Sequence, residues 1–369
     1  MKRILKLVLL ILNAVAVLLL IGSTLAGQVA PSRFALFSLL GYGYLYLVIA
    51  NVVFAVLWLA LGSKWFLLSV AAVLVRYSYM PLYFQVGGTE ALSAEAQAQE
   101  EVLKVLTFNV HHFQGIGLNS ELTDSNMTKF LELVEAEQPD LLAMQEYIGR
   151  GERVHLTEEL RERGYSQMTS GYDNGSMTGE VIFSKLPLQR VVRIEGPAKL
   201  YANLLWGSDT LRLYCLHLSS YGLDANDHRQ LHDLSHGDLQ PSQLMADSGT
   251  LSKFRRTIRA HEEEWEVLQP YFAAHEGLTL VAGDFNDPPA SYFYQCCRRY
   301  FKDCYCEAGQ GFSTTYHGLF TRRGGSIFPA FRIDMVLHSP DLEALTYKRI
   351  KTDISDHDPV VVTIRKAKP

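Results

Sequence analysis

The first 89 residues of this chain contain no aspartate or glutamate, and they carry only six lysines and arginines. Three apolar runs fill this segment, at residues 4–26, 34–61 and 65–84. Each run is close to the roughly 20 residues that a helix needs to cross about 30 Å of hydrocarbon. The sequence therefore predicts a membrane anchor with about three transmembrane helices in residues 1–86, followed by a small, polar linker in residues 87–100.

Basic residues at the start of the chain set the expected orientation of this anchor. Lys2, Arg3 and Lys6 precede the first apolar run, and the positive-inside rule holds such residues in the cytoplasm. Three crossings of the plasma (inner) membrane then place the rest of the chain on the extracytoplasmic side. Two crossings, with the third run at the interface, would return it to the cytoplasm, and a signal peptide cleaved near Ala26 would still leave two anchoring runs.

A transporter core is the alternative for this segment, but a transport site needs polar or broken helices at mid-membrane. The main polar residues within the runs are only Asn13, Asn51 and Arg76. An anchor is therefore favoured.

The remainder of the chain has the opposite charge. Removing the six basic residues of the first segment from the 34 in the whole chain leaves 28 basic against 39 acidic residues, a net charge of −11. Duplex nucleic acid is bound mainly through neutralisation of its phosphates by lysine and arginine. This charge therefore argues against a sequence-indifferent nuclease.

Short apolar runs in this remainder end in polar residues. Residues 102–110 predict a buried strand, a helix with one apolar face follows, and residues 140–146 predict a second strand. Further predicted strands cover residues 181–184, 211–218, 278–284, 333–338 and 359–364. This order predicts a layered α/β domain in residues 101–369.

A layered α/β domain holds its reactive side chains on loops at the strand ends. The polar residues at the predicted strand ends are Asn109, Glu146, His217, Asp284, Asn286, Asp334, Asp356 and His357. Carboxylates, amides and imidazoles without cysteine suit a hard cation such as Mg²⁺ or Mn²⁺ better than structural zinc. Such ions commonly assist the hydrolysis of phosphate esters.

The string GDFNDPP at residues 283–289 is the most informative motif. Asp284 can orient or deprotonate a water molecule, and Asn286 can hold that water or a phosphate oxygen. The alternative is an Asx turn that only ends the strand.

A second motif pairs an aspartate with a histidine about twenty positions later. We expect Asp334 to hydrogen-bond one ring nitrogen of His357, which fixes the tautomer and favours the charged ring. A surface loop is the alternative for this pair, and a core histidine is the alternative for His217.

Eight short strings, in this order along the chain, resemble the endonuclease/exonuclease/phosphatase superfamily, the metal-dependent phosphoesterases related to DNase I and sphingomyelinases. The strings are TFNV, MQE, IFSKLPL, LHLSS, GDFND, STTYHG, RID and SDHDPV, and they cover residues 102–365. The resemblance implies a four-layered α/β sandwich, in which two packed, mainly antiparallel sheets lie between outer helices.

The resemblance also implies a metal site. Glu146 matches the principal metal ligand of the family, with Asn109 and Asp356 near it. The implied ion is Mg²⁺ or Mn²⁺.

The remaining matches concern the water and the phosphoryl group. Asp284 and Asn286 match the residues that align or activate the attacking water. His357, paired with Asp334, and His217 match the two histidines that bind the phosphoryl group. The implied reaction is in-line attack by water without a covalent nucleophile.

Two features depart from the family pattern. Leu216 stands where relatives often carry a hydroxyl residue, and residues 259–262 (RAHE) replace a more usual helix start that contains glutamine. A polar insertion at residues 221–252 carries three histidines at every fourth position, namely His228, His232 and His236. This spacing suits Zn²⁺ or Ni²⁺ on a helix, although a flexible loop at the substrate edge is favoured.

The leading hypothesis is a membrane-anchored, Mg²⁺-dependent phosphodiesterase or phosphatase. Its expected partners are a phosphate-ester substrate, such as a lipid headgroup, a sugar phosphate or a nucleic acid, and the bilayer that residues 1–86 contact. The alternatives are a membrane-tethered nuclease and a catalytically silent binding module of the same fold.

Overall fold

The computed structural model divides the chain into two compact units. The described residues are 2–75, 77–88, 101–115, 124–148, 154–169, 178–196, 199–222, 249–274, 276–317 and 331–368. Unit 1 comprises Met1–Tyr83, Tyr221–Trp265 and Asp287–Arg299, and unit 2 comprises Phe84–Ser220, Glu266–Asn286 and Tyr300–Pro369. The predicted linker lies outside the described residues from residue 89 onward.

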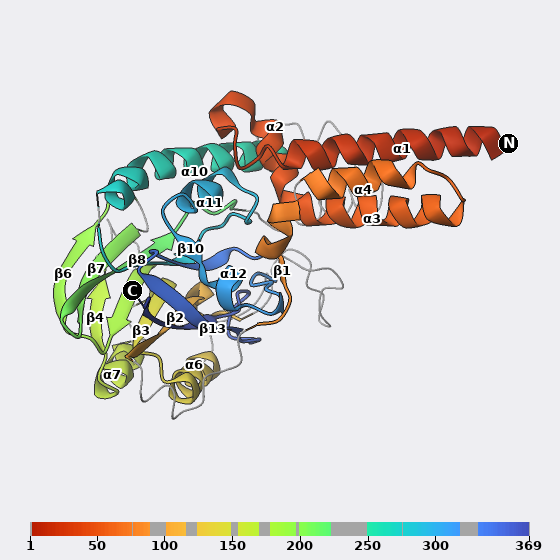
Figure 1. Cartoon of the computed structure of the whole chain (residues 1–369). Coiled ribbons are helices and arrows are strands. Elements are labelled where there is room, and N and C mark those ends of the chain that lie inside the picture. The colour runs from red at the N-terminus through yellow and green to blue at the C-terminus, as the bar shows by residue number, and fades with distance from the viewer. Residues whose placement is uncertain are drawn as a thin grey trace. The chain divides into compact units, whose positions relative to one another are not determined.

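Unit 1 begins with four helices that arise from the three apolar runs (Figure 1). Their bounds are α1 (Lys2–Ser23), α2 (Pro31–Tyr42), α3 (Tyr44–Ala60) and α4 (Phe66–Val75), and the 3₁₀-helix η1 (Tyr77–Leu82) follows. Among the described residues, one helix, α1, is long and apolar enough to cross a membrane, or two spans exist if α2 and α3 form one span bent by 57°.

The prediction of about three transmembrane helices is therefore wrong for the described residues. The second apolar run divides at Gly43, which lies between α2 and α3. The third run is α-helical for only 10 residues, and its later part forms η1 with Pro81 inside. Proline lacks the N–H that an α-helix interior requires, so hydropathy alone overestimated the helix length.

Helices α1, α3 and α4 bury a few polar side chains among apolar ones and expose apolar side chains on their outer surface. Asn13 Nδ2 donates to Ser69 Oγ at 2.6 Å, and Trp58 Nε1 donates to Asn13 Oδ1 at 2.9 Å. Asn51 Nδ2 donates to the backbone oxygen of Ala16 at 3.1 Å. Large apolar side chains are exposed on these helices, among them Ile4, Leu5, Leu12, Leu18, Val53, Val56 and Leu74. This polarity is the reverse of that in a water-soluble bundle.

Unit 1 also contains α11 (Tyr292–Cys297) and the first part of α10 (Thr250–Ala273). The backbone N–H and the hydroxyl of Ser32 donate to the carboxylate of Glu262 at 2.7 and 2.6 Å. The hydroxyl of Tyr42 donates to Asp287, and His261 Nδ1 lies 3.0 Å from Asp287 Oδ2. Polar contacts therefore bind α2 to α10 and to the segment before α11.

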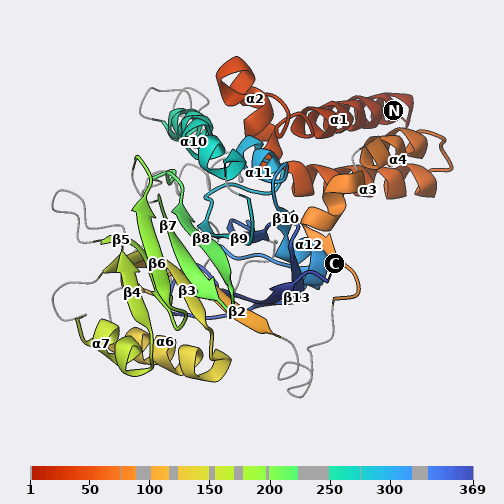
Figure 2. The ribbon, with the colours of Figure 1, turned by 60° about the vertical axis from the view of Figure 1, so that its left-hand side comes forward.

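Unit 2 contains two six-stranded sheets, which Figure 2 shows from the side of β6, β7 and β8. The first sheet has the order β13, β14, β2, β3, β5, β4, and the second has the order β10, β12, β9, β8, β7, β6. Within these described sheets, the pairs β2/β3 and β8/β9 are parallel and the other pairs are antiparallel.

The bounds of the strands are given sheet by sheet. In the first sheet they are β2 (Val102–Asn109), β3 (Leu141–Ile148), β4 (Ser166–Thr169), β5 (Thr178–Ser184), β13 (Leu342–Arg349) and β14 (Val360–Lys366). In the second sheet they are β6 (Leu188–Arg193), β7 (Lys199–Trp206), β8 (Asp209–His217), β9 (Thr279–Asp284), β10 (Lys302–Asp303) and β12 (Asp334–His338). A separate small pair joins β1 (Phe84–Gln85) to β11 (Gly311–Phe312).

The two sheets share one apolar core. Val105 and Ala143 of the first sheet and Leu213 and Ala282 of the second are fully buried in this core. Strands whose two faces are both covered favour near-continuous apolar sequences, as in the runs that predicted β2, β3 and β9.

Helices cover the outer faces of both sheets. Phe130 of α6 (Asp124–Glu137) and Leu160 of α7 (Val154–Glu162) are buried in a second cluster with Phe108 of the first sheet. On the second sheet, the ring of Phe272 from α10 lies 5.1 Å from the ring of Tyr214. The predicted sandwich of two packed, mainly antiparallel sheets between helices is confirmed for unit 2.

Candidate active site

The two parallel strand pairs bring four predicted site residues to their carboxyl ends. Asn109 ends β2, and Glu146 lies near the end of the neighbouring strand β3. In the second sheet, His217 and Asp284 are register partners at the ends of β8 and β9. Because parallel neighbours end at the same edge of a sheet, these side chains gather in one place.

Asn109 joins the carboxylates of the two sheets. Its Nδ2 donates to Glu146 Oε1 at 3.2 Å and to Asp284 Oδ2 at 3.0 Å. Its Oδ1 accepts a hydrogen bond from the backbone N–H of His111 at 3.0 Å. The amide thus presents its nitrogen to the two carboxylates, so the oxygen predicted to bind a metal is directed to the backbone.

Asp284 uses its two carboxylate oxygens differently. Oδ1 accepts the backbone N–H of Asn286 at 2.8 Å, which is the Asx turn considered as the alternative, while Oδ2 contacts Asn109. The side-chain amide of Asn286 donates to the backbone oxygen of Leu218 at 3.0 Å.

Gly283 allows Asp284 to reach this position. Its φ is +145°, and a Cβ atom there would lie 1.9 Å from the backbone oxygen of Leu216 on β8. Only glycine permits this close approach between the parallel strands.

His357 and Asp334 are in direct contact. His357 Nδ1 lies 2.9 Å from Asp334 Oδ2, and its Nε2 lies 3.8 Å from Asp284 Oδ2. The hydroxyl of Thr315 accepts the backbone N–H of Asp334 at 3.1 Å. Burial alone lowers the pKa of His357, but the carboxylates of Asp334 and Asp284 outweigh it and hold that pKa well above its ordinary value.

His217 is mostly buried, as a core histidine would be, yet it faces three carboxylates. Its Nδ1 lies 3.5 Å from Glu180, while its Nε2 lies 3.8 Å from Glu146 and 3.7 Å from Asp284. Burial lowers the pKa of His217, but contact with Glu180 and the charges of Asp284 and Glu146 raise it to about 9. The ring is therefore charged near neutral pH.

Asp356 reaches the site beside a histidine and a tyrosine. Its Oδ1 lies 3.2 Å from His111 Nδ1. The ring of Tyr316 lies 4.9 Å from that of His357, and burial, Asp356, Asp284 and Glu146 raise the pKa of the Tyr316 hydroxyl. This hydroxyl therefore remains a proton donor at neutral pH.

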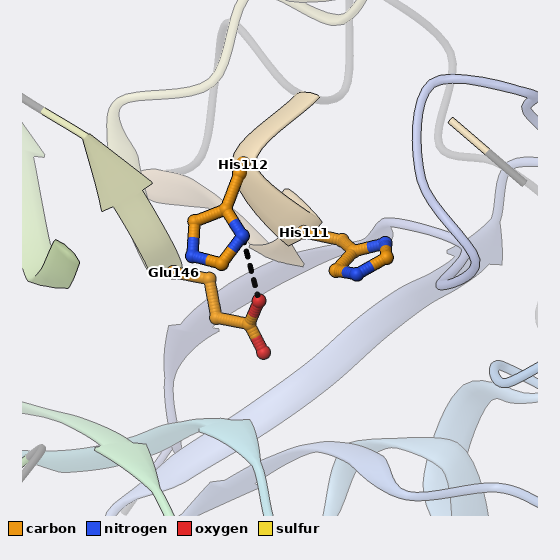
Figure 3. A group of neighbouring side chains, drawn as sticks. All are labelled: His111, His112 and Glu146. Atoms are coloured by element: carbon orange, nitrogen blue, oxygen red, sulfur yellow. Dashed lines mark ion pairs between the residues drawn. The ribbon is translucent and has the colours of Figure 1, made fainter. Parts of the chain in front are cut away.

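Four residues of this site were not predicted as site residues. Glu180 lies within β5, and no sequence pattern marks it. Tyr316 lies within the string STTYHG, which could have identified it as a site residue. His111 and His112 follow the end of β2 after one intervening residue, and this position after a strand end could have identified them. Figure 3 shows His112 facing Glu146, with Nδ1 3.6 Å from Oε2.

The donor groups present fit a divalent cation. Among the described residues, ligand atoms within 4.8 Å of one another occur in two groups, one of His111, His112 and Glu146 and one of Asp284, Asp334 and His357. His217 Nε2 is buried and has no hydrogen-bond partner among the described atoms, although two carboxylates face it. The histidines His228, His232 and His236 lie outside the described residues, as does Arg76.

Residues 106–357 match the model of the Endonuclease/Exonuclease/phosphatase family, and the chain belongs to that family. Its members are phosphoester hydrolases, including nucleases and phosphatases, so the chain is of the phosphoester-hydrolase class. Residues 5–83 match a domain of unknown function, DUF8431. No curated protein matches the chain.

Solved structures of low sequence identity are also similar. The endonuclease/exonuclease/phosphatase from Beutenbergia cavernae DSM 12333 is 17% identical over 72% of each chain, with a TM-score of 0.47. Truncated Caenorhabditis elegans TDP2 is 18% identical over 72% of this chain and 98% of that one, with a TM-score of 0.46. The endonuclease/exonuclease/phosphatase from Bacteroides vulgatus is 16% identical over 72% and 99%, with a TM-score of 0.48.

Proposed function

We propose that this protein is a membrane-anchored, metal-dependent phosphodiesterase or phosphatase that hydrolyses its substrate by in-line attack of water. The observation that carries the proposal is the joining of Glu146 and Asp284 by Asn109, beside two charged imidazoles. Carboxylates with adjacent imidazolium groups suit a metal-bound phosphate ester better than a neutral substrate. The proposed cofactor is Mg²⁺ or Mn²⁺.

Each side chain has a separate role in the proposed hydrolysis. Glu146, with Asn109 and Asp356 near it, would hold a divalent ion, which would supply positive charge to polarise the phosphoryl oxygens. His217 and His357 donate hydrogen bonds to those oxygens and offset the charge that develops on them. Asp334 keeps the ring of His357 charged and oriented.

The attacking water is assigned to the loop after β9. Asp284 Oδ2 accepts a proton from the water or aligns it, because Oδ1 is held in the turn with Asn286. Asn286, whose amide nitrogen is bound to the backbone, retains its side-chain oxygen for the water.

The test of this proposal compares full-length protein in detergent with its Glu146→Gln variant. The panel contains a bis-aryl phosphate, plasmid DNA, phospholipid and sugar phosphates, each with and without Mg²⁺. We expect metal-dependent turnover that falls at least about 100-fold in Glu146→Gln, since a metal ligand supplies several kcal/mol of transition-state stabilisation.

Glu158→Gln is the matched control, because Glu158 is half exposed on α7 and contacts His155 at 3.6 Å, away from the site. Undiminished hydrolysis in Glu146→Gln would refute the metal assignment. Exclusive cleavage of plasmid would favour the nuclease, and a folded, metal-binding protein without turnover on any substrate would favour the binding module.

The membrane part of the proposal is supported by the reversed polarity of α1, α3 and α4. Helices in lipid place polar side chains between themselves and apolar side chains outward, as Asn13, Ser69 and Trp58 do here. The N-terminus of α1 and the connection between α3 and α4 lie at the same end of this bundle (Figure 1). Lys64 lies in that connection, so Lys2, Arg3, Lys6 and Lys64 gather at this end, whereas Arg33 lies in α2.

By the positive-inside rule this end faces the cytoplasm. Figure 1 shows α4 and η1 leading back from it to the opposite end of the bundle, which favours an extracytoplasmic catalytic unit at the plasma membrane even though α4 alone is too short to span it. We expect the protein to stay in the membrane pellet after alkaline carbonate extraction. We also expect a cysteine at the exposed Val86 to react with an impermeant maleimide in intact cells, with unsubstituted protein as control. Labelling only after lysis would place the catalytic unit in the cytoplasm.

A further inference from the structure

A strained turn directly after β2 presents two histidines near Glu146. The turn η2 (His111–Phe113) contains three consecutive non-glycine residues in the left-handed region, with φ values of +40°, +55° and +60°. Each such residue costs about 1–3 kcal/mol, so surrounding contacts must maintain the turn. The backbone N–H of His111 is bound by Asn109, and Phe113 is fully buried in the core.

The separation of the groups that this turn presents fits ligands of one ion. His112 Nδ1 lies 3.6 Å from Glu146 Oε2, which is too long for a hydrogen bond. Two ligands of one ion, each bound at about 2.0–2.2 Å, stand at most about 4.4 Å apart. One ligand atom from each of His111, His112 and Glu146 lies within 4.8 Å of the others, which is close to this limit (Figure 3).

A carboxylate lies beside one of these rings. His111 Nδ1 lies 3.2 Å from Asp356 Oδ1. Histidines that bind metals commonly direct their second ring nitrogen to a carboxylate, which fixes the tautomer and leaves the other nitrogen for the ion. The Asp356 carboxylate lies on the Nδ1 side of the ring, so an ion bound at Nε2 would leave Nδ1 to donate to Asp356.

We propose that His111, His112 and Glu146 form a metal site with two imidazole ligands and one carboxylate ligand. The site selects a first-row transition ion, such as Mn²⁺ or Zn²⁺, over Mg²⁺, because imidazole nitrogen favours transition ions whereas Mg²⁺ favours oxygen. This inference rests on the proposed function, since it adds ligands to the ion at Glu146, and it replaces Mg²⁺ as the preferred ion.

The test uses Mn²⁺ as a paramagnetic probe of full-length, metal-free protein in detergent. Pulsed electron paramagnetic resonance of the bound Mn²⁺ detects coupling to nitrogen nuclei, and protein labelled with ¹⁵N-histidine identifies the ring nitrogens. We expect nitrogen coupling in the unsubstituted protein and its loss in the double variant His111→Gln/His112→Gln. The Mn²⁺ affinity of the double variant falls by roughly tenfold or more, since loss of even indirect ligand contacts costs 10–100-fold.

His155→Gln is the matched control, because it makes the same histidine-to-glutamine change at an exposed position on α7. Bound Mn²⁺ without nitrogen coupling in the unsubstituted protein would overturn the inference without the need for any variant. Coupling that persists in a folded double variant, or Mg²⁺ that displaces Mn²⁺ at equal concentration, would also overturn it.

Failure of the histidine ligands and failure of the proposed function would give different results. Hydrolysis that depends on Glu146, combined with Mn²⁺ free of nitrogen coupling, would keep the function and reject the histidine ligands. Nitrogen-coupled Mn²⁺ without hydrolysis would keep the metal site and reject the function.

Discussion

Glu146 shows how the site tolerates a partly buried carboxylate. Burial raises its pKa, but the imidazoles of His217, His112 and His111, together with the amide of Asn109, outweigh burial and hold the pKa below its ordinary value. An isolated carboxylate in this position would be costly to bury, because nothing would replace its hydration. The same neighbours that stabilise the charge also form the candidate metal site.

Glu180 is the residue whose contribution to pH dependence is clearest. It is buried on β5 and contacts His217 Nδ1, so Glu180→Gln removes one of the carboxylates that keep the pKa of His217 at about 9. We expect the alkaline limb of the pH–rate profile to move to lower pH, since each unit of pKa lost lowers the charged fraction about tenfold above that pKa. The measurement is kcat against pH, with Glu158→Gln as control, and an unmoved alkaline limb would contradict it.

The predicted site residues all came from polar positions at strand ends. Asn109, His217 and Asp284 were open to this reasoning because buried apolar strands precede them, and a rigid strand fixes the position of the residue at its end. Glu180 could not be predicted in this way, because it lies inside a strand of the first sheet and contacts His217 of the second sheet. Its effect depends on the packing of two sheets, which no local pattern contains.

At the scale of elements, the strands predicted from the sequence also differ from the missed strands in how continuous their apolar sequence is. Strands with long buried runs, such as β2, β9 and β14, were predicted with errors of a residue or two. The missed strands include β6, an edge strand with a largely exposed pattern, and β7, an internal strand whose mostly buried sequence is interrupted by the polar residues Lys199 and Asn203. Edge strands need no continuous apolar sequence, so periodicity gives them little signal.

Gly283 offers a test of how closely β8 and β9 approach. Gly283→Ala and Gly277→Ala both place a side chain at positive φ, but the added Cβ meets the backbone of Leu216 only at Gly283 and meets nothing within 4 Å at Gly277. We expect Gly277→Ala to cost about 1 kcal/mol in free energy of unfolding and Gly283→Ala more than about 3 kcal/mol. Denaturant unfolding of both variants measures this difference, and equal losses would show that the strands separate easily.

Glu307 in α12 (Cys304–Ala308) is expected to make the stability of unit 2 decrease at acidic pH. Burial raises its pKa, but the contact with His338 and the backbone N–H of Ala344 outweigh burial and lower the pKa to about 2. A lowered folded-state pKa stabilises the protein above pH 4.5, and this contribution is lost as pH falls from about 4.5 towards 2.

We therefore expect Glu307→Gln to reduce stability by about 2 kcal/mol at pH 7, which is less than the full pKa shift implies because solvent screens this partly exposed carboxylate, and to have little effect near pH 2. Melting temperatures of the full chain across this range are the measurement. Glu343→Gln is the control, because Glu343 is more exposed in its ion pair with Arg365. A deficit that stays constant across the range would contradict the pKa assignment.

At the scale of the whole molecule, charge divides the chain into a basic, apolar segment and an acidic remainder. A nuclease that makes 6–10 phosphate contacts loses about 10³–10⁵ in affinity between roughly 50 and 200 mM salt. We expect weak plasmid cleavage, and we expect hydrolysis of a small bis-aryl phosphate to change little over this range. Plasmid nicking at physiological salt, at a rate equal to that on the small ester, would contradict the prediction.

The amide of Asn109 also bears on how the protein is made. Because its Nδ2 already contacts both Glu146 and Asp284, two carboxylates are held together by the chain itself. Many small metal sites do not exist before the ion arrives, and their domains stay unfolded until then. Because the chain itself bridges these two carboxylates, we expect this domain to fold without a bound ion, so that its biogenesis would not depend on the metal supply of the compartment in which folding takes place.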